Sequence, residues 1–238
     1  MTIISGERIS RSIAVFDYTE VALSALLADL VGSEDFMVDI GAYFGYISLL
    51  GSRLVGSSGR VLAFEPNPQA FSIAKKNLAP HPQAEVRQMA VLDERRSVSL
   101  EDRPVHDSAF SSVVSGAERT NHTTIDVLAN SLGELLRDRD RPLDLLKCDA
   151  EGAEESVLQG GASVIENDRP IIVLEVGMKG EEYSERLKEI KACMKGANYE
   201  MRDFEYEGSL TVVEARRGEE KFSGHANLLL VPEESKMD

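Results

Sequence analysis

The chain has 238 residues, of which 42% are hydrophobic, so it is long enough to bury a full hydrophobic core. Its formal net charge is -15, from 41 acidic and 26 basic side chains. Nucleic acids and anionic membranes are bound mainly through Lys and Arg, so this charge argues against both classes of partner.

The two cysteines, Cys148 and Cys193, fall in an expected strand and an expected helix. Two such residues do not form a disulfide framework, which favours a reducing compartment. The apolar stretch 21–31 is too short to span a membrane and lacks the basic flank of a signal peptide. We therefore expect a cytoplasmic protein, and the sequence leaves its oligomeric state open.

Strand and helix signals alternate along most of the chain. Apolar runs typical of buried strands lie at 36–40, 60–64, 84–91, 143–148, 170–176, 210–213 and 226–231. Capping residues and helical spacing of apolar residues predict helices over 17–31, 45–55, 67–78, 131–137, 154–158 and 183–197. Asp17 with Glu20 and Ser131 with Glu134 form capping-box patterns, and Asn67 precedes a first-turn proline.

Strands that alternate with helices predict a parallel sheet covered on both faces, because each right-handed crossover lays a helix against the sheet. The last two expected strands are joined without a helical pattern and are predicted to form an antiparallel pair at the sheet edge. We expect an α/β, Rossmann-like doubly wound fold with one domain over 35–238, on which residues 1–34 pack as a helical segment. The segment 93–122 has no sustained period and is expected to form small strands and loops that shape a substrate pocket.

The first expected strand runs directly into a glycine turn. Asp39, Gly41 and Gly45 give the pattern Asp-x-Gly-x-x-x-Gly, in which Gly41 permits a tight turn and close approach of a ligand. Glu65 ends the next strand, where an acidic side chain of a nucleotide-binding unit accepts hydrogen bonds from both ribose hydroxyls. An ordinary strand-to-helix turn and a solvated strand-end carboxylate are the alternatives for these two features.

Asp39 takes the place of the first glycine of a dinucleotide-binding turn. A carboxylate there would repel a pyrophosphate, which sits on the helix N-terminus in that type of site. It suits a ligand with an ammonium group, a sulfonium and no phosphate, as in S-adenosylmethionine. The pattern therefore disfavours a nicotinamide-dependent oxidoreductase.

The sequence resembles the FkbM-type methyltransferases. The resemblance rests on the blocks at 39–42, 63–67, 145–154, 170–175 and 227–232, and it covers roughly residues 35 to 232. The block Lys-x-Asp-x-Glu-Gly-Ala-Glu, which starts at Lys147, is its most specific part. Leu132-Gly133 departs from the Leu-Asp that is common in the family. The resemblance implies a class I fold with seven strands, the last inserted antiparallel, and methyl transfer, usually to a hydroxyl of a sugar or other small metabolite.

Chemistry and resemblance together give the candidate cofactor contacts. They are Asp39, Gly41, Ala42, Tyr43, Gly45, Glu65, Pro66, Asn67, Met89, Ala90 and Asp149. Asp39 and Gly41 are expected to border the methionine moiety and Glu65 the ribose, with Asn67 and residues 89–90 beside ribose and adenine.

Carboxylates crowd at the end of the expected strand 143–148. Asp149, Glu151 and Glu154 are close in sequence. Like charges at such short distances raise the pKa of a carboxyl group, which suits a general base near neutral pH. Asp149 and Glu151 could instead hold Mg²⁺ together with Glu175, or the acids could simply favour a helix N-terminus.

Two histidines, His106 and His122, lie in or beside the Ser-rich segment and are further catalytic candidates, with a plain surface position as the alternative. The leading hypothesis is an S-adenosylmethionine-dependent O-methyltransferase that acts on a small-molecule hydroxyl. A non-catalytic S-adenosylmethionine-binding protein with the same fold remains an alternative, since fold does not imply function.

Overall fold

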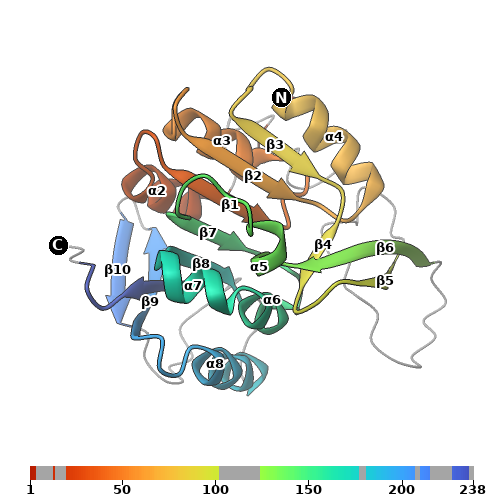
Figure 1. Cartoon of the computed structure of the whole chain (residues 1–238). Coiled ribbons are helices and arrows are strands. Elements are labelled where there is room, and N and C mark those ends of the chain that lie inside the picture. The colour runs from red at the N-terminus through yellow and green to blue at the C-terminus, as the bar shows by residue number, and fades with distance from the viewer. Residues whose placement is uncertain are drawn as a thin grey trace.

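The computed structural model describes residues 1–3, 13, 20–101, 124–176, 181–206, 210–214 and 227–235, and strands alternate with helices along them (Figure 1). The strands are β1 (Phe36–Ile40), β2 (Arg60–Phe64), β3 (Ala84–Arg87), β4 (Ala90–Leu92), β5 (Arg96–Glu101), β6 (Thr124–Ser131), β7 (Leu145–Cys148), β8 (Ile171–Glu175), β9 (Tyr199–Tyr206), β10 (Leu210–Glu214) and β11 (Asn227–Pro232). The helices are α2 (Val21–Leu30), α3 (Tyr46–Leu54), α4 (Pro68–Leu78), α5 (Leu132–Leu135), α6 (Glu154–Gly160), α7 (Ala162–Asp168) and α8 (Glu181–Cys193).

The main sheet runs in the order β10-β9-β11-β8-β7-β1-β2-β3. In this sheet the adjacent strands β3, β2, β1, β7 and β8 are parallel, whereas β11 is antiparallel to both β8 and β9. The chain leaves β1 toward β2 on one side and returns to β7 on the other. Ligands of open α/β sheets bind at such a switch point, beyond the carboxyl ends of the strands. The predicted doubly wound, mostly parallel fold with antiparallel C-terminal strands is confirmed.

The C-terminal edge of the sheet is larger than the sequence indicated. β9 lies between the two predicted antiparallel strands, β10 and β11, so these do not pair with each other. The main sheet therefore has eight strands among the described residues. β9 was not predicted because four of the eight residues of Tyr199–Tyr206 are charged, which breaks the apolar run expected of a buried strand.

A second sheet of three strands has the order β4-β6-β5. The predicted strand 84–91 is divided between the two sheets, because β3 ends at Arg87 and β4 begins at Ala90. β6 is parallel to β4 and antiparallel to β5. In Figure 1, β5 and β6 extend to one side of the main sheet from the end of β4. The second sheet thus begins shortly after the carboxyl end of β3.

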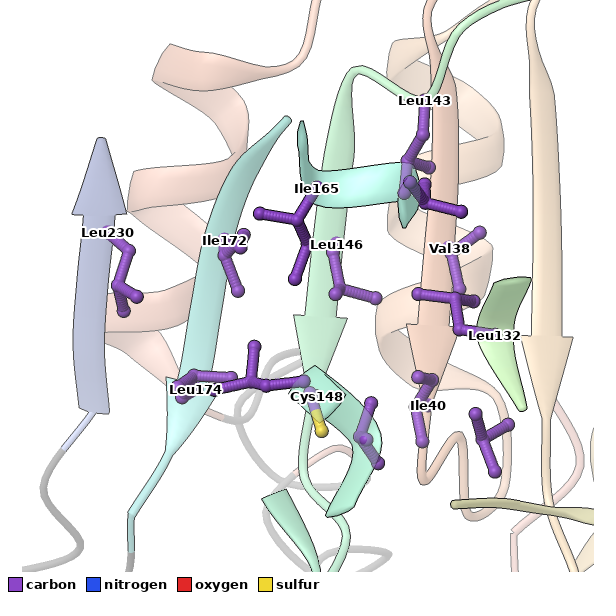
Figure 2. Packing of buried hydrophobic residues seen from close by; sticks show 14 of the residues in the cluster. Val38, Ile40, Leu132, Leu143, Leu146, Cys148, Ile165, Ile172, Leu174 and Leu230 are labelled. Carbon is purple, nitrogen blue, oxygen red and sulfur yellow. The ribbon is translucent and has the colours of Figure 1, made fainter. Parts of the chain in front are cut away.

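One face of the main sheet packs against α5, α6, α7 and α8. Val38, Leu146, Ile172 and Leu230 stand in register across β1, β7, β8 and β11, and all four are buried. Figure 2 shows this row together with Ile165 of α7. The parallel strands are therefore held by a continuous apolar layer on this side.

The opposite face packs against α2 and α3. Here the row in register consists of Asp39, Lys147, Val173 and Leu229. The first two side chains are charged, although all four are buried. An acid and a base thus replace two apolar side chains in the middle of the sheet.

The predicted caps at two helix starts are confirmed. Asn67 accepts hydrogen bonds from the backbone amides of Gln69 and Ala70, and Ser131 accepts one from the amide of Glu134. These side chains satisfy amides that have no partner within the first helical turn.

The N-terminal helix starts later than the capping box at Asp17 predicts. α2 begins at Val21 after Glu20, which has a left-handed backbone with φ 48° and makes no side-chain cap; Asp17 lies outside the described residues. Leu26 and Leu27 of α2 are buried in the same cluster as Leu229. Among the described residues, no helix is long and apolar enough to cross a bilayer.

Candidate functional site

A pocket lies at the carboxyl ends of β1, β2 and β7 and reaches the second sheet. It is lined by Ile40, Gly41, Tyr43, Phe64, Glu65, Pro66, Met89, Ala90, Val91, Leu92, Leu100, Asp149, Ala150, Glu151 and Ala153. Its empty volume is about 620 Å³ with the open solvent at its mouth included.

The pocket brings together most of the predicted cofactor contacts. Those in its wall are Gly41, Tyr43, Glu65, Pro66, Met89, Ala90 and Asp149, whereas Asp39, Ala42, Gly45 and Asn67 lie outside the wall. Asn67 is buried, and its side-chain oxygen Oδ1 caps α4. Its Nδ2 has no hydrogen-bond partner among the described residues.

The glycine turn after β1 is held between two neighbouring strands. Gly41 has φ +75°, and its amide and that of Ala42 donate to the carbonyl of Phe64, each at 3.0 Å. On the other side, the amide of Asp149 donates to the carbonyl of Ile40 at 3.0 Å. The turn therefore brings Gly41 directly beside Asp149.

Glu65 presents a buried carboxyl group to the pocket. Its Oε2 accepts from the amide of Tyr43 at 2.7 Å and its Oε1 accepts from the amide of Asn67 at 2.8 Å. Burial raises the pKa of Glu65 to about 7, although these two hydrogen bonds work in the opposite direction. Each carboxylate oxygen has a second lone pair, so Glu65 can accept further hydrogen bonds from a ligand.

Asp39 is not in contact with the pocket. Its side chain is fully buried, Oδ2 accepts from the hydroxyl of Ser48 at 2.5 Å, and Oδ1 lies 3.2 Å from Nζ of Lys147. The expected place of Asp39 beside the methionine moiety stays a prediction, because its carboxylate lies behind the pocket wall. The ammonium group beside it belongs to Lys147.

Lys147 belongs to the family-like sequence block, but the sequence predicts no role for it. Its side chain is buried, which disfavours the charge, but the carboxylates of Asp39 and Asp149 outweigh this effect and raise the pKa of Lys147 above its usual range. The signal that could have found the pair is a lysine inside an apolar strand, since a buried charge needs a partner of opposite sign.

Asp149 and Glu175 lie side by side at the ends of two adjacent strands. Asp149 comes directly after β7 and Glu175 ends β8, and the pairing of Cys148 with Leu174 sets them side by side. Burial and then the charge of Asp149 raise the pKa of Glu175 to about 9. At neutral pH a protonated Glu175 can donate a hydrogen bond to Asp149, which is 24% exposed and lines the pocket.

Glu154 stabilises the loop after β7 and is not placed beside Asp149 as a further candidate base. Its Oε1 accepts from the amides of Ala150 and Gly152, and its Oε2 accepts from Nη1 of Arg186 at 3.1 Å. Burial raises the pKa of its carboxyl group despite these donors. Glu154 thus shapes the loop in which Glu151, with φ 49°, lines the pocket.

The alternative in which Asp149, Glu151 and Glu175 hold Mg²⁺ is not supported by the structure. No group of three or more His, Cys, Asp or Glu side chains is arranged to hold a metal ion in the part of the chain that the structure describes. The ammonium group of Lys147, 3.8 Å from Oδ2 of Asp149, supplies positive charge there instead. His106 and His122 lie outside the described residues.

Comparisons with known proteins identify the type of fold and the motifs. The sequence profile of the family described as Methyltransferase FkbM domain matches residues 39–201. Curated protein sequences gave no match.

Three solved structures illustrate the similarity of fold. An FkbM methyltransferase from Methylobacillus flagellatus KT has a TM-score of 0.55 and 16% identity, over 83% of this chain and 43% of that chain. Cofactor-bound Rv0187 from MTB has a TM-score of 0.53 and 14% identity, over 92% and 83%. Aeropyrum pernix fibrillarin with natively bound S-adenosylmethionine has a TM-score of 0.51 and 14% identity, over 88% and 73%. The chain spans less than half the length of the first of these proteins.

Proposed function

This chain belongs to the FkbM methyltransferase family, and we propose that it transfers a methyl group from S-adenosylmethionine to a hydroxyl oxygen of a small molecule. The observation that carries the proposal is one pocket whose wall contains both Glu65 and Asp149. We assign the first to the ribose of the cofactor and the second to activation of the acceptor.

The residues present fit an adenosine group. Glu65 offers two carboxylate oxygens, already oriented by the amides of Tyr43 and Asn67, to a pair of ribose hydroxyls. The apolar side chains of Met89 and Leu100 line the same pocket and can contact the adenine ring. Gly41 allows close approach of the ligand to the backbone.

The bound cofactor supplies an activated methyl group on its sulfonium. An alcohol is a poor nucleophile until its proton is removed, and a positioned base contributes typically about 10²–10⁴-fold to the rate. Asp149 lines the pocket and keeps part of its side chain exposed, so it can accept the proton of an acceptor hydroxyl. Glu151 lines the same wall and is the second candidate for this role.

We also propose a cytoplasmic location and a small-molecule partner, with neither a nucleic acid nor a membrane as partner. Cys148 and Cys193 are both free thiols, as expected in a reducing compartment. The net charge of -15 disfavours nucleic acids and anionic membranes as partners.

The test is transfer of a labelled methyl group from S-adenosylmethionine to a panel of hydroxylated small molecules. The proposal expects label in an acceptor, with equal formation of S-adenosylhomocysteine. Cofactor binding without transfer to any acceptor would support the non-catalytic alternative. Transfer to amines or carboxylates but to no hydroxyl would overturn the specificity proposed here.

A further inference from the structure

The ammonium group of Lys147 lies among four oxygen atoms behind the pocket wall. Its Nζ donates to the carbonyl of Gly41 at 2.9 Å and lies 3.4 Å from the carbonyl of Ile40. It is 3.2 Å from Oδ1 of Asp39 and 3.8 Å from Oδ2 of Asp149. The two carbonyl oxygens accept hydrogen bonds from Nζ, and the two carboxylates form ion pairs with it.

Folding alone does not account for this buried ion pair. β1 and β7 are already joined by backbone pairing from Met37 to Ile40. The pairs on either side of Asp39 and Lys147 in the register are apolar on both strands. Well-packed apolar residues often replace a buried ion pair without loss of stability, because desolvation of the charges offsets their attraction.

The contacts of Lys147 instead connect two parts of the pocket wall. Gly41 belongs to the turn after β1 and Asp149 to the end of β7, and both line the pocket, whereas Lys147 does not. One ammonium group therefore fixes the direction of the Gly41 carbonyl and holds the Asp149 carboxylate beside it. Asp39, with its second oxygen bound by Ser48, keeps the ammonium group in place.

We infer that Lys147 is a positioning residue that sets the Gly41 carbonyl and the Asp149 carboxylate for cofactor binding while Asp39 balances its charge. The inference rests on the proposed function, since it takes the pocket as the cofactor site. It extends that function to a residue that touches neither cofactor nor acceptor. A site arranged before the ligand arrives loses less free energy on binding.

The decisive variant is the double substitution Asp39→Asn with Lys147→Met. Lys147→Met alone leaves a buried carboxylate without its partner, so loss of binding could follow from unfolding. The double variant removes both charges and retains similar side-chain volumes. We expect it to unfold cooperatively, near the melting temperature of the unmodified protein, while its dissociation constant for S-adenosylhomocysteine rises at least fivefold.

A matched control is Arg139→Met with Asp168→Asn. This half-buried ion pair lies at the amino ends of β7 and β8, away from the pocket, where Asp168 also accepts from the amide of Leu143. The control variant should bind S-adenosylhomocysteine with unchanged affinity. Loss of affinity in the control to the same extent would overturn the inference, because removal of any buried pair would then be enough.

Calorimetric titration with S-adenosylhomocysteine distinguishes the outcomes. A folded double variant that binds within fivefold of the unmodified protein overturns the role of Lys147 and leaves the proposed function intact. An unmodified protein that does not bind overturns both. If the double variant does not fold, the dissociation constant of Lys147→Arg is compared with the same fivefold threshold. This variant keeps the positive charge beside Asp39, but its planar guanidinium cannot reproduce the contacts of an ammonium group.

Discussion

The carbonyl oxygen of Asp149 lies where the side chain of any residue other than glycine would begin at position 41. A Cβ atom built on Gly41 is 1.9 Å from that oxygen. The turn after β1 and the end of β7 are thus in direct backbone contact at the switch point of the sheet. The contact places the glycine turn and the candidate base in one pocket wall.

Gly41→Ala is expected to weaken binding of S-adenosylhomocysteine at least tenfold, because the added methyl group must separate the turn from Asp149. Gly56→Ala is the matched control: Gly56 also has positive φ, +67°, but nothing lies within 4 Å of its added Cβ. The control should lose about 1–2 kcal/mol of unfolding free energy from backbone strain alone and keep its affinity. Equal affinities for the two variants would show that the contact is irrelevant to the site.

Glu65→Ala is expected to weaken cofactor binding far more than folding. Loss of a hydrogen bond to a charged acceptor costs roughly 1.5–3 kcal/mol, which corresponds to about a ten- to hundredfold change in affinity. Calorimetry with S-adenosylhomocysteine measures this change, and thermal unfolding measures stability. Glu94→Ala, at a side chain that is 70% exposed, is the control that should leave affinity unchanged. A Glu65→Ala variant with unchanged affinity would remove Glu65 from the site.

Cofactor affinity should rise with pH between about 6 and 8. Burial raises the pKa of Glu65 to about 7 in the free protein, and only the ionised carboxyl group has both oxygens available as acceptors. Below this pKa the site must lose a proton on binding, so affinity falls by up to about tenfold per pH unit. Titrations at several pH values in buffers of different ionisation enthalpy measure the proton release. A flat profile that matches that of Glu65→Gln would contradict the assignment.

Glu175→Gln is expected to stabilise the protein at neutral and alkaline pH. The pKa of Glu175 is raised to about 9 in the folded protein from 4.5, so the folded state binds more protons between these values and stability falls as pH rises through them. The glutamine cannot ionise, so its variant should have a free energy of unfolding that is roughly 1–3 kcal/mol higher at pH 7. Denaturant unfolding at pH 4.5 and pH 8 measures it. A gain that is the same at both pH values would contradict the protonated state of Glu175.

Asp149→Asn is expected to lower turnover at least tenfold on any acceptor identified by the labelled-methyl panel, with little change in cofactor affinity. Its carboxylate lines the pocket and is the candidate acceptor of the hydroxyl proton. Glu155→Gln, on the first turn of α6 and outside the pocket wall, is the control. Full turnover by Asp149→Asn would show that Asp149 is not the base, and Glu151, His106 and His122 would be the remaining candidates.

The sequence predicts those parts of the site that depend on strand ends. Gly41, Glu65 and Asp149 each follow a recognisable apolar strand, and parallel strands bring their carboxyl ends to one edge of the sheet. Their convergence in one pocket therefore needs only the strand pattern and the handedness of the crossovers.

The ion pair of Asp39 and Lys147 could not be predicted in the same way. It depends on the register of two strands more than a hundred positions apart, which local patterns do not contain. Asp39 was therefore expected to face the ligand. Glu154 illustrates the same limit, because its partner Arg186 comes from α8. β6 and β9 were missed because their exposed or charged residues interrupt the apolar runs by which buried strands are found.

Calorimetric titration of the unmodified protein with S-adenosylhomocysteine, in parallel with NAD, tests the central claim most directly. The account predicts saturable binding of S-adenosylhomocysteine at one site per chain and competition with S-adenosylmethionine. It also predicts no measurable binding of NAD, since the turn lacks the glycines that accommodate a pyrophosphate. Binding of NAD without binding of S-adenosylhomocysteine would contradict the assignment of the pocket.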